Sequence, residues 1–282
     1  MEFTGERFIP GQGGAIELEH LNRYYFVVHQ IDLKGKTVLD IASGEGYGSN
    51  IIAKHASKVI GVDISFEAIE HAKNKYKANN LEFVQGSVVE IPMEESSVDV
   101  VVSFETLEHH DKHDEMIIEI KRVLKVDGIL IISSPDKYYY SELPNTLNKY
   151  HIKELYNEQF KQLLNKYFNF TFHYSQRMIL GSIIVPIGRD INSMNIDIIN
   201  ENGTNLEFNP VYNVAIGTDN FDFIPKNKIV LYDKSDEILN FECIKEAMES
   251  GVRTGMQKIR SSKRYLIGKF ILKPFSFLKN LK

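Results

Sequence analysis

Residues 38–49, with the sequence VLDIASGEGYGS, decide the fold. A short, mostly apolar run at 38–41 leads into glycines at alternate positions, Gly44, Gly46 and Gly48. A glycine-rich turn after a strand lets backbone N–H groups approach a ligand at the N-terminus of the next helix. The stretch therefore indicates the first strand and the ligand-binding loop of an α/β protein.

Strand-like and helix-like segments alternate on the C-terminal side of this loop. The strand-like segments are rich in Val and Ile, which is typical of a parallel sheet covered by helices on both faces. We therefore expect an α/β, doubly wound fold with a mostly parallel, seven-stranded, Rossmann-like sheet. The expected strands lie at 36–41, 58–64, 81–87, 98–104, 128–135, 170–180 and 211–219, and the expected helices at 15–30, 50–56, 66–78, 114–124 and 153–167.

Composition and charge narrow the class of protein. The 282 residues carry a formal net charge of −5 and include one cysteine, Cys243, so we expect no internal disulfide and a reducing, cytoplasmic compartment. No apolar stretch approaches the ~18 residues of a membrane-spanning helix. The charge is uneven, because residues 250–282 carry nine Lys or Arg and no acid, which leaves −14 on residues 1–249.

Carboxylates close the first two expected strands. Asp40 ends the first strand, where it can meet a cationic amine beside the glycine turn, and Asp63 ends the second, where it can bridge two ribose hydroxyls. The segment FVQGSVVEIP at 83–92 brings Gly86, Ser87 and Val88 to flank an adenine ring. An amine, a ribose and an adenine without a pyrophosphate cradle describe S-adenosylmethionine.

Four segments, VLDIASGEGYGS, VIGVDIS, FVQGSVVEIP and VVVSFETLEH, resemble in order and spacing the motifs of class I S-adenosylmethionine-dependent methyltransferases. The resemblance covers about residues 35–175 and implies their fold and their cofactor. Ala42 departs from it, standing where the family often has its first loop glycine, and Ser87 stands where many members have an aspartate. The expected cofactor-binding residues are His20, Arg23, Asp40, Ala42, Gly44, Gly46, Tyr47, Asp63, Ile64, Gly86, Ser87, Val88 and Phe104.

The segment TGERFIPGQGGAIELEHLNRYYF at 4–26 resembles the opening of a methyltransferase subgroup found in bacterial surface-polysaccharide and sugar-modification pathways. That resemblance implies that the segment folds over the cofactor, with His20, Arg23 and Tyr24 facing the site. Arg23 could then pair with the cofactor's carboxylate. The alternative is an ion pair of Arg23 with Glu19 on a solvated helix face. The sequence leaves both interpretations open.

The segment SFETLEHH at 103–110 follows the fourth strand, at the carboxyl edge of the sheet. If a helical turn begins there, Glu105, Glu108 and His109 share one face, and His110 points elsewhere. Together with His151, which follows the fifth strand, the pattern resembles small-RNA terminal 2′-O-methyltransferases and, more loosely, ubiquinone-pathway O-methyltransferases.

The resemblance to these enzymes implies a Mg²⁺ or Mn²⁺ site made by Glu105, Glu108, His109 and His151. Such a cation lowers the pKa of a bound hydroxyl, and His109 or His110 could take the proton. Two alternatives stay open, an active-site role without a metal and a merely solvated helix start.

Three parts are expected along the chain. Residues 1–30 form an N-terminal helical cap, residues 31–235 the methyltransferase domain with an insertion loop at 188–213, and residues 236–282 a basic helical extension. The sequence predicts an O-methyltransferase acting on a sugar hydroxyl of a glycan or nucleotide-linked precursor. The alternatives are a phenol or quinone-like acceptor and a catalytically silent scaffold protein in glycan assembly.

Partners follow from the same charge pattern. The acidic body disfavours nucleic acid as a substrate, because phosphate contacts need cations. Residues 251–282 interleave cations with Phe and Leu, so they either pack on their own domain or contact a partner enzyme or the inner membrane surface. The sequence does not fix the oligomeric state.

Overall fold

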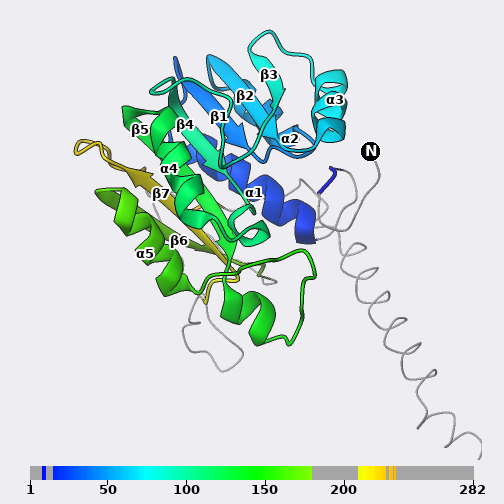
Figure 1. Ribbon diagram of the computed structural model, residues 1–282, viewed down its shortest axis with the longest axis vertical. Coiled ribbons are helices and arrows are strands. Elements are labelled where there is room, and N and C mark those ends of the chain that lie inside the picture. Colours follow the sequence, from blue (N-terminus) through cyan, green and yellow to red (C-terminus); the bar gives the residue numbers. More distant parts are fainter. Residues whose placement is uncertain (1–7, 11–14, 180–208, 227–228, 231, 233–282) are drawn as a thin grey trace, which may run out of the picture. The chain divides into compact units, whose positions relative to one another are not determined.

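The structure, a computed structural model, describes residues 8–10, 15–179, 209–226, 229–230 and 232 (Figure 1). Its helices are α1 (Ala15–Gln30), α2 (Tyr47–Ala53), α3 (Phe66–Lys75), α4 (His113–Val123) and α5 (Asn157–Tyr167), with the helical turns η1 (Leu107–His109) and η2 (Lys137–Glu142). Its strands are β1 (Thr37–Ile41), β2 (Lys58–Asp63), β3 (Leu81–Gln85), β4 (Val98–Ser103), β5 (Leu124–Pro135), β6 (Phe170–Gln176) and β7 (Tyr212–Thr218).

These strands form one seven-stranded sheet in the order β3-β2-β1-β4-β5-β7-β6. Strand β7 runs antiparallel to β5 and β6, and the other neighbouring pairs are parallel. The chain proceeds outward from β1 to β3 and then returns to place β4 beside β1. The predicted doubly wound, mostly parallel α/β fold is confirmed, and a ligand is expected at the carboxyl ends of β1 and β4, where the strand order reverses.

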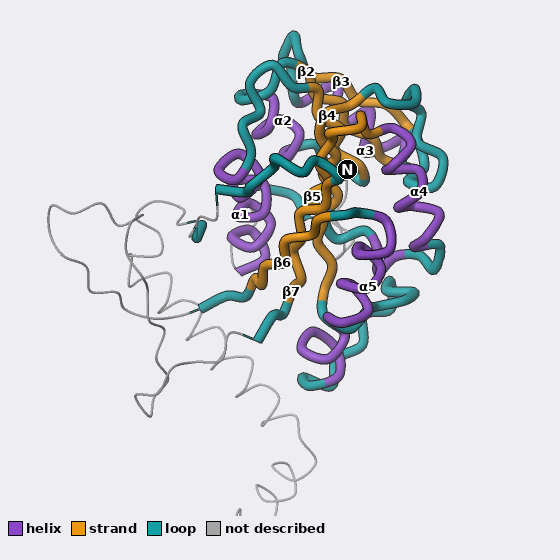
Figure 2. Tube along the Cα trace, turned by 90° about the vertical axis from the view of Figure 1, so that its left-hand side faces the viewer, coloured by secondary structure: helices purple, strands orange, loops and turns teal. Residues whose placement is uncertain are grey.

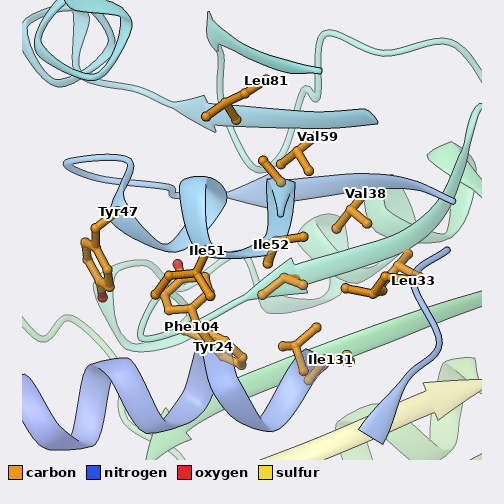
Figure 3. Close-up of a cluster of buried hydrophobic side chains, with 14 of the residues drawn as sticks. Tyr24, Leu33, Val38, Tyr47, Ile51, Ile52, Val59, Leu81, Phe104 and Ile131 are labelled. Carbon is orange, nitrogen blue, oxygen red and sulfur yellow. The ribbon is translucent and has the colours of Figure 1, made fainter. Parts of the chain in front are cut away.

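Helices cover both faces of the sheet (Figure 2). Side chains of α1, α2 and α3 pack against one face, and those of α4 and α5 against the other. Side chains of successive strand residues point to opposite faces of the sheet. Val38 therefore packs in the cluster beneath α1, α2 and α3, and Leu39 in the cluster beneath α4 and α5. Figure 3 shows the first cluster, with Ile51 and Ile52 of α2 above Tyr24 of α1.

Helix α4 illustrates how the sequence pattern fixes this packing. Met116, Ile117, Ile120 and Val123 recur at helical spacing, and all four side chains are fully buried. Full burial of one such side chain contributes about 1.5–3 kcal/mol. The opposite side of α4 carries exposed charges, so the helix has one orientation that buries its apolar stripe.

Some expected boundaries are wrong for local reasons. The helix expected at 153–167 begins at Asn157, because Lys153 N–H donates instead to the Glu108 carbonyl at 3.1 Å. Asn157 N–H in turn donates to Asp136 Oδ2 at 2.7 Å, which fixes the helix start. The strand expected at 170–180 ends at Gln176, and the loop expected at 188–213 extends too far, since β7 already begins at Tyr212.

Other expectations fall outside the described residues. These are the greater part of the insertion loop, at 188–208, the helical extension at 236–282 and Cys243. Among the residues that the structure describes, no helix is both long and apolar enough to cross a membrane.

Candidate active site

A pocket of about 360 Å³ opens at the carboxyl edge of the sheet. The glycine loop after β1, the end of β2 and the segment after β4 form its floor. Helix α1, η2, the loop that follows η2 and the start of β7 form its walls. Its lining is Phe8, Ile16, His20, Tyr24, Ala42, Ser43, Gly44, Glu45, Tyr47, Asp63, Phe104, Glu105, Glu108, His109, Tyr140, Asn148, His151 and Tyr212.

The glycine loop adopts a left-handed backbone at three positions, with φ of 56° at Ala42, 56° at Gly44 and 91° at Gly46. Ala42 therefore occupies a conformation that favours glycine, at a cost of about 1–2 kcal/mol for a residue with a Cβ atom. Asp63 Oδ2 accepts a hydrogen bond from Gly44 N–H at 2.8 Å, so the loop is fastened to the end of β2.

Gly48 is needed for close packing against Tyr24 and not for a left-handed backbone. A Cβ atom at this position would lie 1.9 Å from the Tyr24 ring. Tyr24 also meets Tyr47 and Phe104 edge to ring, at centroid distances of 5.3 and 5.1 Å (Figure 3). Helix α1 thus packs directly on the glycine loop.

Asp40 does not reach the pocket, contrary to the expectation that it meets the cofactor's amine directly. Its carboxylate is fully buried and accepts hydrogen bonds from Ser49 Oγ at 2.6 Å and Tyr24 OH at 3.2 Å. Burial raises the pKa of Asp40 to about 7. Tyr24, one of its two hydrogen-bond donors, lines the pocket, whereas Asp40 does not.

The pocket brings together only some of the expected cofactor residues. His20, Ala42, Gly44, Tyr47, Asp63 and Phe104 line it. Gly46, Ile64, Gly86, Ser87 and Val88 are not among the described residues that do so. Gly86 N–H nevertheless donates to the Asp63 carbonyl at 3.0 Å, and Ile64 is 73% exposed just past Asp63. Both residues thus lie next to Asp63 without lining the pocket.

Arg23 is buried, so the solvated Glu19–Arg23 pair considered from the sequence is wrong. Its Nη1 donates to Gln176 Oε1 at 2.7 Å and lies 3.8 Å from Glu105 Oε1, and the guanidinium lies over the Tyr212 ring. Neither Nε nor Nη2 has a hydrogen-bond partner among the described residues. Arg23 is not part of the pocket lining, and its position behind Glu105 makes it a counter-charge for that carboxylate.

The helical turn expected from Glu105 is also wrong. Glu105 has a left-handed backbone with φ of 50°, and only Leu107–His109 form a short 3₁₀ turn. Glu105 therefore does not share a helical face with Glu108 and His109. Its Oε1 accepts from Ser133 Oγ at 2.6 Å, on the side of the pocket that Arg23 supports.

Glu108, His109 and His151 come together across the pocket. One ligand atom from each lies within 4.8 Å of the other two, which is a spacing that a single cation could bridge. Burial and the neighbouring Glu105 raise the pKa of Glu108 well above its ordinary range. Ser134 Oγ donates to Glu108 Oε2 at 3.3 Å, and a bound cation would add charge compensation for this buried carboxylate. This donor set fits Mg²⁺ or Mn²⁺, with Mn²⁺ favoured by the histidines.

His110 lies apart from this group, as the sequence predicted. Its Nε2 contacts Met116 Sδ at 3.3 Å, and its Nδ1 accepts from Lys112 N–H at 3.2 Å. Burial lowers the pKa of His110. Because it is not among the described lining residues, the structure gives no support to His110 as the base.

Sequence reasoning missed several pocket residues that come from distant segments. Glu45 is fully buried in the glycine loop and accepts from Tyr76 OH at 2.7 Å, which ties the loop to the end of α3. Tyr140, Asn148 and Tyr212 reach the pocket from η2, from the loop after it and from β7. No local pattern marks Glu45, Asn148 or Tyr212, whereas Tyr140 belongs to a visible tyrosine run at 138–140, just past the fifth strand.

Known proteins resemble the part of the chain that holds the pocket. Residues 39–132 match the family model described as a methyltransferase domain. A protein of Mycolicibacterium smegmatis named "Probable S-adenosylmethionine-dependent methyltransferase" is 34% identical over 168 residues, covering 58% of this chain and 63% of the relative. The phthiotriol/phenolphthiotriol dimycocerosates methyltransferase of Mycobacterium tuberculosis is 30% identical over 111 residues, 39% of this chain and 41% of that one. The chain thus spans less than two thirds of the length of these relatives.

Solved structures agree on the fold. A methyltransferase from Archaeoglobus fulgidus, described as dependent on S-adenosylmethionine, superposes with a TM-score of 0.53 and 18% identity, covering 73% of this chain and 95% of the other. At this identity the likeness shows the fold alone.

Proposed function

We propose that this chain, whose residues 39–132 form a methyltransferase domain, transfers a methyl group from S-adenosylmethionine to a sugar hydroxyl of a glycan or nucleotide-linked precursor. Different observations support the class of reaction and the choice of acceptor. The domain match and the relatives support the transferase class and its cofactor. The hydroxyl acceptor is supported by the pocket, and its assignment to a sugar by the resemblance of the N-terminal segment.

The observation that carries the proposal is the position of Glu108, His109 and His151 in the same pocket as the glycine loop. A divalent cation on these residues would lower the pKa of an acceptor hydroxyl and fix its orientation. Asp63 and the loop would hold the cofactor on the opposite side. Methyl transfer is an in-line displacement, so its rate depends mainly on how such a pocket aligns the two reactants.

Glu105 is the pocket carboxylate left to accept the hydroxyl proton. His109 belongs to the proposed ligand set, and His110 lies outside the lining. Glu105 lines the pocket and is kept in place by Ser133 Oγ at 2.6 Å, with Arg23 at 3.8 Å as counter-charge. As the bond from oxygen to the methyl group forms, the proton passes to Glu105 and the methyl–sulfur bond breaks, which leaves S-adenosylhomocysteine.

The test is release of S-adenosylhomocysteine by the full chain with a panel of sugar nucleotides, glycan fragments and catechols. We expect product with a sugar acceptor, loss of activity after exhaustive chelation, and recovery on adding Mn²⁺ or Mg²⁺. Full activity in the chelated enzyme would remove the metal from the proposal. No product with any acceptor would favour a silent scaffold protein instead.

A small phenol or quinone-like acceptor is the second candidate. A groove lined by Tyr139, Tyr140 and Tyr150 continues from the pocket and shares Tyr140 and Asn148 with it. Aromatic faces of this kind can stack on a phenolic ring. Turnover of catechols but of no sugar in the same panel would select this candidate.

A further inference from the structure

We propose that Glu154 is the outer carboxylate of the metal centre, and that it fixes the His151 ring as a metal ligand. The inference rests on the metal centre proposed above and adds a positioning residue that does not itself touch the ion. It starts from the contact of His151 Nδ1 with Glu154 Oε1, at 2.5 Å. Both side chains are buried, with 7% of His151 and 9% of Glu154 exposed.

The hydrogen-bond network fixes the tautomer of His151. Tyr150 N–H donates to Asn148 Oδ1 at 3.1 Å, so the other end of that amide, Nδ2, faces His151 Nε2 at 2.9 Å. An amide nitrogen can only donate, and Nε2 must therefore carry a lone pair. The ring proton sits on Nδ1 and is donated to Glu154 Oε1.

Glu154 is itself held in place. Ser141 Oγ donates to the same Oε1 atom at 2.7 Å. The Tyr140 ring lies almost parallel to the His151 ring, with the centroids 5.3 Å apart and the planes at 23°. The imidazole is thus fixed in rotation by a carboxylate and in tilt by an aromatic face.

His109 has the same tautomer as His151. Its Nδ1 lies 3.2 Å from the Tyr150 carbonyl, which can only accept, so this nitrogen carries the proton and Nε2 has the lone pair. Both rings therefore carry their lone pair on Nε2, and a cation bound to His151 would replace the hydrogen bond that Asn148 Nδ2 donates there. Metal-binding histidines usually donate their other N–H in this way to a carboxylate or a carbonyl, and losing that partner typically costs 10–100-fold in metal affinity.

The first experiment measures Mn²⁺ affinity of the full chain without acceptor, from the electron paramagnetic resonance signal of free Mn²⁺. We expect Glu154→Gln to bind Mn²⁺ about 10–100-fold more weakly than wild type. Glu158→Gln is the matched control, because Glu158 is 75% exposed and pairs only with Lys161 among the described residues. Calorimetry with S-adenosylhomocysteine should show unchanged cofactor affinity in both variants.

A second readout does not depend on the metal. In metal-free, ¹⁵N-histidine-labelled protein, His151 should keep the Nδ1–H tautomer in Asn148→Ala, where Glu154 alone holds the ring proton. It should become a mixture containing Nε2–H in Asn148→Ala/Glu154→Leu, with His151→Asn used for assignment. Ser141→Ala keeps Glu154 and should weaken Mn²⁺ binding by a smaller factor. This variant provides a milder test if Glu154→Gln or Asn148→Ala/Glu154→Leu fails to fold.

The outcomes separate this inference from the proposed function. If wild type and Glu154→Gln bind Mn²⁺ equally well, the role of Glu154 is overturned and the proposed metal centre is retained. An unchanged Nδ1–H tautomer in Asn148→Ala/Glu154→Leu also overturns that role. Wild type that binds no Mn²⁺ overturns both.

Discussion

Gly46 is a loop residue at which both backbone conformation and packing exclude a side chain. Its φ is +91°, and a Cβ atom would lie 2.8 Å from Ala72 Cβ and 2.9 Å from the Phe83 ring. We expect Gly46→Ala to lose several kcal/mol of unfolding free energy, because strain from φ and overpacking each cost about 1–3 kcal/mol. Gly35→Ala is the control, with φ of +78° but no atom within 4 Å of its Cβ, and should lose only about 1–2 kcal/mol. Urea unfolding measures both, and equal losses would contradict the packing argument.

Asp40 should make stability depend on pH. Its pKa is about 7 in the folded chain and about 3.9 when unfolded, so between these values the native state binds more protons. The contribution of Asp40 to the unfolding free energy is therefore fully present below about pH 4 and lost as pH rises through 7.

Asp40→Asn keeps an acceptor for Ser49 and Tyr24 but does not titrate. The unfolding free energy of wild type minus that of Asp40→Asn should fall by up to about 4 kcal/mol from pH 4.5 to pH 8, at ~1.4 kcal/mol per pKa unit. Urea titrations of both proteins across this range measure the difference. A difference that stays constant with pH would show that Asp40 is ionised throughout.

Glu105→Gln distinguishes the base proposed from the structure from the metal ligand predicted from the sequence. As the proton acceptor, Glu105 should give a variant with kcat lowered about 10²–10⁴-fold and Mn²⁺ affinity changed little. As a ligand, its loss should weaken Mn²⁺ binding as strongly as His151→Asn does. Parallel turnover and Mn²⁺ measurements decide between these two roles.

At the scale of elements, the Gln176 side chain connects α1 to the edge strand β6 by two hydrogen bonds. Gln176 of β6 accepts from Arg23 Nη1 at 2.7 Å and donates to the Glu19 carbonyl at 2.9 Å. We expect Gln176→Ala to lose about 2–4 kcal/mol, because a buried charge loses its hydrogen bond. Gln85→Ala removes one exposed bond, to the Ile64 carbonyl, and should lose less than about 1 kcal/mol. Hydrogen exchange over residues 15–30 should rise in Gln176→Ala alone.

The elements were predictable where local pattern decides them. Buried strands such as β4 are recognisable in the sequence as runs rich in Val and Ile. Ser65, a residue type that favours helix N-caps, caps α3. The turn after β4 was not predictable, because the left-handed backbone at Glu105 depends on Ser133 of β5, 28 residues away in the chain. The burial of Arg23 likewise depends on β6 and β7, which no spacing within α1 reveals.

The site was predictable in outline and not in detail. The glycine loop, Asp63 and the group around Glu108 follow from motifs, and the structure gathers them in one pocket. The role of Asp40 was misjudged, because a strand-end position does not show which side chains will cover it. Glu154 went unnoticed, since its use depends on how η2 and the following loop fold together.

At the scale of the whole molecule, the C-terminal segment is basic and the rest of the chain is acidic. Residues 250–282 carry nine Lys or Arg, against −14 on residues 1–249. We propose that residues 251–282 contact an anionic membrane surface, since each cation near such a surface contributes about 1 kcal/mol. Co-sedimentation with vesicles containing phosphatidylglycerol should fall on deleting these residues and at high salt. Equal binding of both chains would end the membrane proposal.

The antiparallel position of β7 has an evolutionary consequence. Gln176 ends β6 and Tyr212 begins β7, and the two are register partners at the pocket edge of the sheet. The 35-residue connection between them therefore begins and ends beside the pocket, far along the chain from the glycine loop. During evolution this whole connection could be replaced, which would change the choice of acceptor while the glycine loop and Asp63 stay the same. A laboratory chimera could make the same replacement with two junctions.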